Sequence, residues 1–493
     1  MKFKKMLVKL QQTLANSYER KSLAPAHRTK RESLIASFLW LFALCYIALP
    51  NGVTTKIGVI DLPNNSSALL IRKSWGLGDA GSILEAALTW SNFKQLDPIN
   101  QSWIPRLWSL GLSVIEVPLI WMERFGLSLF WSLLSTTLAL YVSIFYILWR
   151  YFSVFTGRIP IIFASGLLIA SWDFQYIFRS YLFYTEGIGY GFLLLGLLLV
   201  TRWILEENPG RFPKIGGIFI GLSIWVRHTS DLGLLLLLTL SFMGWVFLCV
   251  GGNRGRNRIF TKIIPGYGKQ HDKKVRLTPF FGGLVKASSL AILITIPWRL
   301  ISFFLYDSGT FMMSTAGGGV GSNIWSGPES GTAKYWNYYG INWACDIDPK
   351  KCKEILLEIE QSNFHGSLLI EGVITAIIRF PDYLSNRFQT FSQNWIPEFS
   401  IFGNLQSIIA SLSLLIVPVT IILFFKISSS KKYVILTLWF SFLMMQVAQL
   451  LVIHYEPRYF IPIRMLILGL AMGFYSIYQK EKRDELMKFS KLT

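Results

Sequence analysis

Ionisable side chains stand where several long apolar runs of this chain begin or end. Charge beside an apolar run is costly in a membrane, so a functional role is the default interpretation of such residues. Guanidinium groups bind phosphate through paired N–H donors, and carboxylates accept protons or bind hydroxyl groups. We therefore expect one site for a phosphate-bearing substrate, built from Asp79, Arg179, Glu186, Arg227, His454, Glu456, Arg458 and Tyr459.

Three of these positions have structural alternatives. Asp79 lies between a glycine-rich turn and a helical run from 82 to 90, so its carboxylate is expected at a helix N-terminus, which favours the ionised form. It could equally serve as a simple N-cap. Glu456 and Arg458 could likewise form an ion pair that only holds the turn between two apolar runs.

Composition predicts the class of protein. The chain has 493 residues, of which 52% are hydrophobic and 15% charged, and its mean hydropathy is +0.43. These values indicate an all-α polytopic membrane protein. The net charge of +20 does not indicate nucleic-acid binding, because Lys and Arg concentrate in the loops on the N-terminal side of the membrane.

The positive-inside rule orders the chain into a cytoplasmic basic tail at 1–32, a transmembrane domain at 33–478 and a cytoplasmic tail at 479–493. Two large external loops are expected, at 51–125 and 306–400, and the stretch 103–123 is expected to form an interfacial helix. About ten spans of roughly 20 apolar residues are expected. They cover 33–50, 126–149, 159–172, 185–203, 214–228, 231–250, 282–304, 401–425, 433–453 and 460–478.

Two cysteines and the histidines bear on redox state and metals. Cys345 and Cys352 lie in the second external loop and are a disulfide candidate in an oxidising compartment. The five histidines are scattered without paired helical spacing, so no metal site is expected. Gly217 and Gly221 form a small-xxx-small pattern, which predicts close helix packing.

Several segments, in order, resemble the C-type glycosyltransferase superfamily, which uses polyprenyl-phosphate sugars. The similarity is to its protein-mannosyltransferase and aminoarabinose-transferase-like branch. The segments begin at Asp79-Ala-Gly-Ser-Ile-Leu-Glu, Phe125-Gly, Thr185-Glu, Gly217-Ile-Phe-Ile-Gly and Glu456-Pro-Arg-Tyr-Phe-Ile-Pro. The chain departs from the family pattern at Ala80, where a second acid is often found, and at Ile83, where an aromatic residue is usual.

The resemblance implies a membrane glycosyltransferase that moves a sugar from a polyprenyl-phosphate donor to an acceptor hydroxyl by a single inverting displacement. Asp79 would be the catalytic base, Arg227, Arg458 and Arg179 would bind the donor phosphate, and four residues would bind substrate: Glu186, His454, Glu456 and Tyr459. No cofactor is required, although a divalent metal is compatible. The partners would be the lipid donor and a glycan, lipid or protein acceptor.

Two other classes remain open from the sequence. A transporter or flippase of lipid-linked saccharide would place charge near the middle of spans and show repeated halves. A polysaccharide polymerase or ligase would also need a large external loop and arginines. The expected location is a bacterial inner membrane with both termini cytoplasmic, and the endoplasmic reticulum is the alternative.

Overall fold

The computed structural model describes residues 26–48, 78–96, 111–170, 177–178, 185–206, 212–250, 277–305, 350, 374, 377–385, 388, 414–452 and 457–492. Within these ranges the chain is helical and has no strand, which confirms the all-α class. The helices are α2 (Ala26–Ala48), α4 (Gly78–Ser91), α6 (Gly111–Glu123), α7 (Leu129–Ile147), η1 (Leu148–Phe152), α8 (Ser153–Thr156), α9 (Arg158–Ala170), α11 (Thr185–Glu206), α12 (Phe212–Val226), η3 (His228–Ser230), α13 (Asp231–Val250), α15 (Thr278–Leu305), α23 (Ile416–Lys426), α24 (Lys431–Val452) and α25 (Pro457–Leu492).

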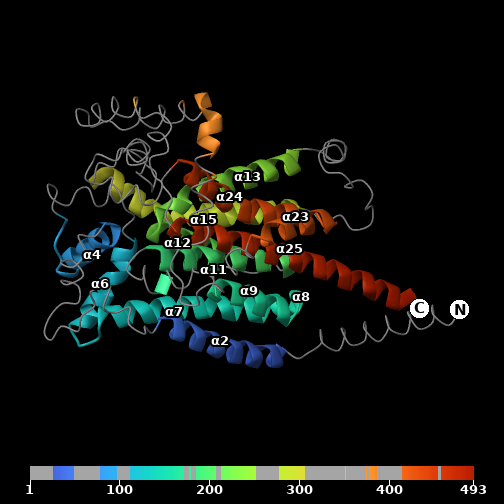
Figure 1. Ribbon diagram of the computed structural model, residues 1–493, viewed down its shortest axis with the longest axis horizontal. Coiled ribbons are helices and arrows are strands. Elements are labelled where there is room, and N and C mark those ends of the chain that lie inside the picture. Colours follow the sequence, from blue (N-terminus) through green and yellow to red (C-terminus); the bar gives the residue numbers. More distant parts are fainter. Residues whose placement is uncertain are drawn as a thin grey trace.

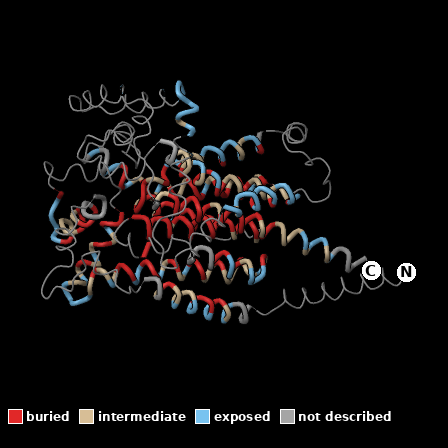
Figure 2. Tube along the Cα trace, viewed as in Figure 1, coloured by how far each residue is buried: buried red, intermediate tan, exposed pale blue. Residues whose placement is uncertain are grey.

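Helix α11 forms the buried centre of the bundle (Figures 1 and 2). Glycines bring its neighbours close: a Cβ at Gly196 of α11 would lie 2.8 Å from the carbonyl oxygen of Gly216 in α12. On the other side of α12, a Cβ at Gly217 would lie 2.4 Å from the carbonyl oxygen of Ala287 in α15. The small residues therefore serve helix packing, as the sequence predicts.

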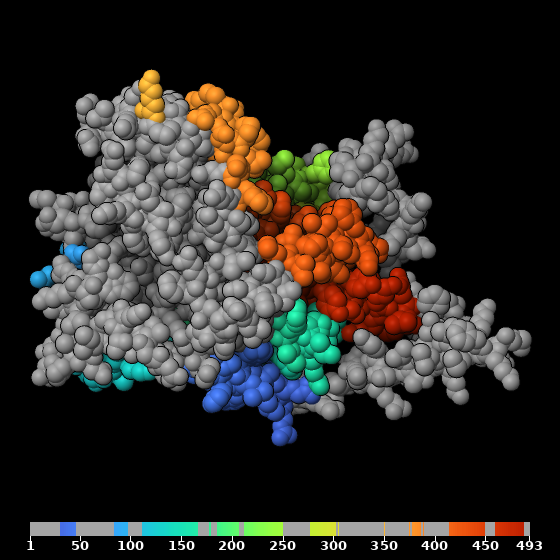
Figure 3. All heavy atoms as spheres, viewed as in Figure 1, coloured from blue at the N-terminus to red at the C-terminus, as the bar shows by residue number. Residues whose placement is uncertain are grey.

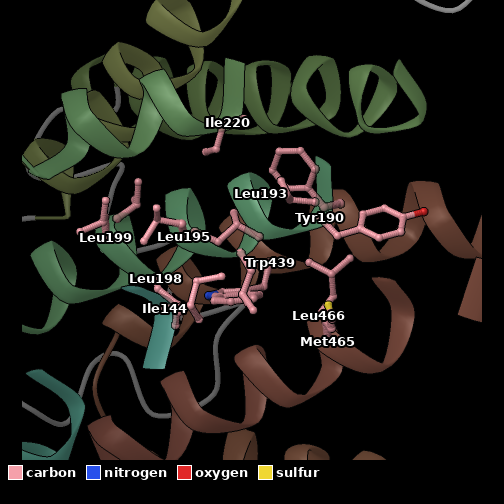
Figure 4. Packing of buried hydrophobic residues seen from close by; sticks show 14 of the residues in the cluster. Ile144, Tyr190, Leu193, Leu195, Leu198, Leu199, Ile220, Trp439, Met465 and Leu466 are labelled. Atoms are coloured by element: carbon pink, nitrogen blue, oxygen red, sulfur yellow. The ribbon is translucent and has the colours of Figure 1, made fainter. Parts of the chain in front are cut away.

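The side chain of Trp439 fills the space between α24, α11 and α25 (Figure 4). It is completely buried, and its indole Nε1 donates a hydrogen bond of 2.8 Å to Thr201 Oγ1 of α11. The indole ring lies directly over Gly469 of α25, where a Cβ would lie 2.1 Å from Cζ3. This contact leaves no room for a side chain at position 469.

Gly469→Ala is expected to destabilise the protein, because the added methyl group overlaps a fully buried ring. Overpacking of this kind costs about 1–3 kcal/mol. Thermal unfolding in detergent should show a lower Tm for the variant. Gly282→Ala is the control, since its Cβ would meet Trp245 at an ordinary 3.4 Å. Equal Tm values for Gly469→Ala and the unchanged protein would contradict the prediction.

Five helices in the described part of the chain are long and apolar enough to cross a membrane. They cover Leu129–Thr156, Thr185–Glu206, His228–Cys249, Thr278–Ile301 and Tyr459–Met487. Helices α2 and α23 lie at the surface of the molecule (Figure 3). Large apolar side chains face outward from them, and Phe42 and Phe425 are each 77% exposed. Spans of this kind and apolar outer faces are typical of a membrane protein.

The expected count of ten spans is not met by the described residues. Three of the expected spans are short helices: α9 has 13 residues, α12 has 15 and α23 has 11. At 1.5 Å per residue they reach about 17–22 Å, against a hydrocarbon core of about 30 Å. Helix α12 ends early because Arg227 adopts an extended backbone, with φ −138° and ψ 103°. Helices α2 and α24 are not among the five, and 401–425 is described only from residue 414.

Helix α25 has 36 residues, and its C-terminal part projects beyond the rest of the bundle (Figure 1). Its last turns bind three other elements. Lys480 Nζ donates to the carbonyl oxygen of Leu205 at 3.2 Å, Arg483 Nη2 donates to that of Val154 at 2.8 Å, and Glu481 accepts the backbone N–H of Ser428 at 3.1 Å. This end of the bundle is therefore tied together by α25. We call it the tail end, and the opposite end, where α4 and α6 lie, the α4 end.

Candidate functional site

A buried ion pair joins α11 and α12 at the α4 end. Glu186 lies in the first turn of α11 and Arg227 directly follows α12. Arg227 Nη1 lies 2.8 Å from Glu186 Oε1 and donates to Thr185 Oγ1 at 2.9 Å. The Glu186 side chain is fully buried and that of Arg227 is 8% exposed. The structure thus brings together two residues that the sequence singled out separately.

A second buried ion pair begins directly after η3. Asp231 begins α13, and both of its carboxylate oxygens accept hydrogen bonds from Arg299 of α15. The Arg299 Nη1 to Asp231 Oδ2 distance is 3.0 Å, and Arg299 Nε donates to Thr295 Oγ1 at 2.8 Å. The Asp231 side chain is fully buried and that of Arg299 is 4% exposed. Forked contacts of this kind fix the orientation of both side chains.

The short helix η3, His228–Ser230, connects the two ion pairs. Together, Glu186, Arg227, Asp231 and Arg299 form what we call the polar layer. Each guanidinium in it already has a carboxylate partner, so the layer is internally paired. Arg227 was predicted to bind a donor phosphate and Glu186 a substrate, whereas in the structure these two side chains bind each other.

Helices α4 and α6 pack on each other. Ser113 Oγ of α6 donates to the carbonyl oxygen of Ile83 at 2.7 Å, and Trp121 Nε1 donates to that of Ser91 at 2.8 Å. The first residue of α6, Gly111, touches α12: a Cβ there would lie 2.3 Å from the carbonyl oxygen of Trp225. Trp225 is two residues before Arg227, so α6 sits directly against the helix end that carries the first ion pair.

A row of indole rings makes a second connection between α4 and the bundle. The ring centroids of Trp90 in α4 and Trp298 in α15 are 6.5 Å apart, and those of Trp298 and Trp225 are 6.3 Å apart. Trp225 Nε1 donates to the carbonyl oxygen of Ile294 in α15 at 2.7 Å. Trp298 directly precedes Arg299. Helix α4 is therefore anchored to Trp298 in α15, the residue before Arg299, and through it to Trp225 near the end of α12.

Asp79 is the second residue of α4, one helical turn before Ile83. Its backbone is thus placed at a helix N-terminus, close to the contact of α4 with α6, and its side chain lies outside the described residues. Comparison with known proteins adds no assignment. No family model, curated protein or solved structure matches this chain.

The remaining predicted site residues lie at or beyond the limits of the described ranges. Tyr459 is the third residue of α25, half-buried, and packs against Phe460 and Ile463. Arg458 precedes it in α25, but its side chain is outside the described part, and so are Arg179, His454, Glu456, Cys345 and Cys352. Among the described residues, no group of three His, Cys, Asp or Glu side chains could hold a metal ion.

Sequence reasoning did not select three buried charged residues of this end: Asp231, Arg299 and Glu116. A signal was present for Arg299, because it is a charged residue within the apolar run predicted as span 282–304. Asp231 stood at the start of another predicted span. Their pairing could not be predicted, because it depends on which helices are neighbours in space.

Glu116 of α6 is completely buried, and neither of its carboxylate oxygens has a hydrogen-bond partner. Burial alone raises the pKa of this carboxyl well above its ordinary value of 4.5, since removal from water disfavours the charged form. The neutral acid is thus the form that the folded protein prefers. The same group in the unfolded chain ionises at its ordinary pKa.

This difference gives a pH-dependent stability. Because the folded-state pKa is raised, ionisation of Glu116 costs stability as pH rises from about 4.5 through the folded-state pKa. Glu116→Gln removes that cost. The variant should therefore gain stability over the unchanged protein as the pH of a detergent unfolding series rises from 4.5 to 8. Glu123→Gln, on the same helix, is the control, and a pH-independent difference for Glu116→Gln would contradict the prediction.

Proposed function

We propose that this chain is a membrane glycosyltransferase that moves a sugar from a polyprenyl-phosphate donor to an acceptor hydroxyl. The observation that carries the proposal is the packing of α4, which begins with Gly78 and Asp79, on the end of the bundle that holds the polar layer. Gly111 against Trp225 and the Trp90–Trp298 contact both support it. A candidate base is thereby placed on the same end as the buried arginines.

The chemistry would be a single displacement. Asp79 takes the proton from the acceptor hydroxyl while that oxygen attacks the anomeric carbon, and the bond from the anomeric carbon to the phosphate oxygen breaks. The electron pair leaves with the lipid phosphate, and the anomeric configuration inverts. Because Arg227 is paired with Glu186, we assign the departing phosphate first to Arg458 and Arg179. Arg227 and Glu186 then shape the wall of the site, and His454, Glu456 and Tyr459 contact sugar or acceptor.

The proposed setting is a bacterial inner membrane with both termini in the cytoplasm, which puts the α4 end on the external side. The basic tail before α2 and the Lys and Arg residues near the end of α25 support this orientation. A lipid-phosphate donor would then reach the site from the outer leaflet. The acceptor would arrive from the aqueous side.

Loss of the chain from its host tests this function. Mass analysis should show a polyprenyl-phosphate sugar accumulating and the same sugar missing from a surface glycan, lipid or protein. A flippase would give a similar cellular result, so the purified protein is then placed in vesicles that carry extracted donor on both leaflets together with surface-glycan acceptor. Sugar transfer in these vesicles supports the proposal. Unchanged sugar profiles in the cells, or no transfer in the vesicles, would overturn it.

A further inference from the structure

Helix α6 exposes a row of apolar side chains, unlike a helix on the surface of a water-soluble protein. Its exposed side carries Val114, Pro118 and Met122, spaced four residues apart, with Val114 44% and Met122 40% exposed. Its buried side carries the polar residues Ser113 and Glu116 together with Leu112 and Ile120. Residues four apart lie on one face of a helix, so the exposed face is a continuous apolar stripe. We call these three residues the α6 stripe.

The turn after α4 points a large apolar side chain outward. Phe93 is 85% exposed and has a left-handed backbone, with φ 57°. Contacts from α6 hold this turn: the Trp121 ring stacks on the Phe93 ring at 5.6 Å, and Arg124 Nη2 donates to Asn92 Oδ1 at 2.8 Å. A strained backbone persists only where its surroundings impose it. The outward direction of Phe93 is therefore built into the fold.

The turn after α6 does the same. Phe125 is 87% exposed and Leu127 is 53% exposed, on either side of Gly126, whose φ of 88° makes the turn. The membrane-crossing stretch of α7 begins at Leu129, and Trp131 on it is 53% exposed. Because α7 starts within a few residues of the end of α6 (Figure 1), Phe125 and Leu127 lie next to the start of a candidate span.

We propose that the α6 stripe, Phe93, Phe125 and Leu127 insert into the bilayer leaflet at the α4 end and seat the α4–α6 pair on it. The occupant of this surface is membrane lipid, since the chain enters a candidate span at Leu129, two residues after Leu127, and exposes Trp131 there. Charge agrees with a headgroup level here: Lys94 and Arg124 are exposed beside the two phenylalanines and can meet lipid phosphates. Aromatic side chains at such a level are characteristic of membrane interfaces.

Nitroxide labels test the depth of this surface. Labels are attached to cysteines at positions 93 and 125 in a chain whose four natural cysteines are serines, and the protein is placed in phospholipid vesicles. Collisions with oxygen and with a water-soluble nickel chelate are then compared. A label at position 42, on the apolar outer face of α2, is the reference for a residue in contact with lipid. A label at position 382, an exposed aspartate, is the comparison for an exposed polar residue.

The expected result is an oxygen-to-nickel collision ratio at 93 and 125 several-fold above that of a free nitroxide in water and approaching that at 42. A ratio equal to that of the free nitroxide at both positions would overturn the proposal. If the cysteine-free chain does not fold, a photoactivatable benzoylphenylalanine at 93 in the otherwise unchanged chain replaces it. Irradiation in nanodiscs should give a lipid adduct detectable by mass spectrometry, and its absence would likewise overturn the proposal.

Discussion

Arg299→Gln is expected to cause the largest loss of stability among single substitutions in the polar layer. The variant leaves Asp231 as a fully buried carboxylate without its guanidinium. Removing one partner of a buried ion pair typically costs about 3–5 kcal/mol, because the remaining charge stays out of water. Denaturant unfolding in detergent micelles, followed by circular dichroism, should show the midpoint shifted to clearly lower denaturant.

Two comparisons isolate the cause. Arg158→Gln breaks the pair with Glu32, in which the Arg158 side chain is 59% exposed, and exposed pairs are worth at most about 1 kcal/mol. The double variant Asp231→Asn/Arg299→Gln replaces both charges by amides and should be more stable than Arg299→Gln alone. If Arg158→Gln and Arg299→Gln cost the same, the buried pair does not have the role assigned to it.

Asp79→Asn is expected to give the largest loss of activity. The amide cannot accept the proton of the acceptor hydroxyl, and general-base help is typically worth about 10²–10⁴ in rate. Initial rates of sugar transfer in vesicles, at saturating acceptor, should fall within this range. The amide keeps the size of the carboxylate, so Tm should change little.

Glu85→Gln is the matched control for Asp79→Asn, because it makes the same chemical change six residues further along the same helix. It should retain most of the transfer rate. In the unchanged protein, the plot of transfer rate against pH should be bell-shaped or sigmoid, with a fall in rate at acidic pH. This fall should be absent in Asp79→Asn. Undiminished transfer by Asp79→Asn would remove this residue from the mechanism even if the protein is a transferase.

The sequence located one half of the polar layer and missed the other. Glu186 and Arg227 each stood at the edge of an apolar run, so the cost of placing charge in a membrane identified them. Asp231 stood at the start of one apolar run, and Arg299 stood within another. The mean hydropathy of such a run stays high when it contains one charged residue, so it does not identify that residue. Only the packing of α13 on α15 makes them a pair.

Within the described residues, the expected ten spans are not all found, for a related reason. Hydropathy measures how apolar a stretch is, whereas a span also needs an unbroken helix. The run predicted as 214–228 ends its helix at Val226, because Arg227 turns away to reach Glu186. The local signal in Gly217 and Gly221 was sufficient, by contrast, because small residues at that spacing have few uses other than close helix contact.

The contacts of α25 at the tail end decide where the bundle can move. Lys480, Glu481 and Arg483 fasten α25 to α11, to the residues before α24 and to α8. A rod clamped at one extremity pivots there, so any widening between helices must grow with distance from the clamp. Entry of the proposed bulky lipid substrate would therefore separate the helices at the α4 end and leave the tail end closed.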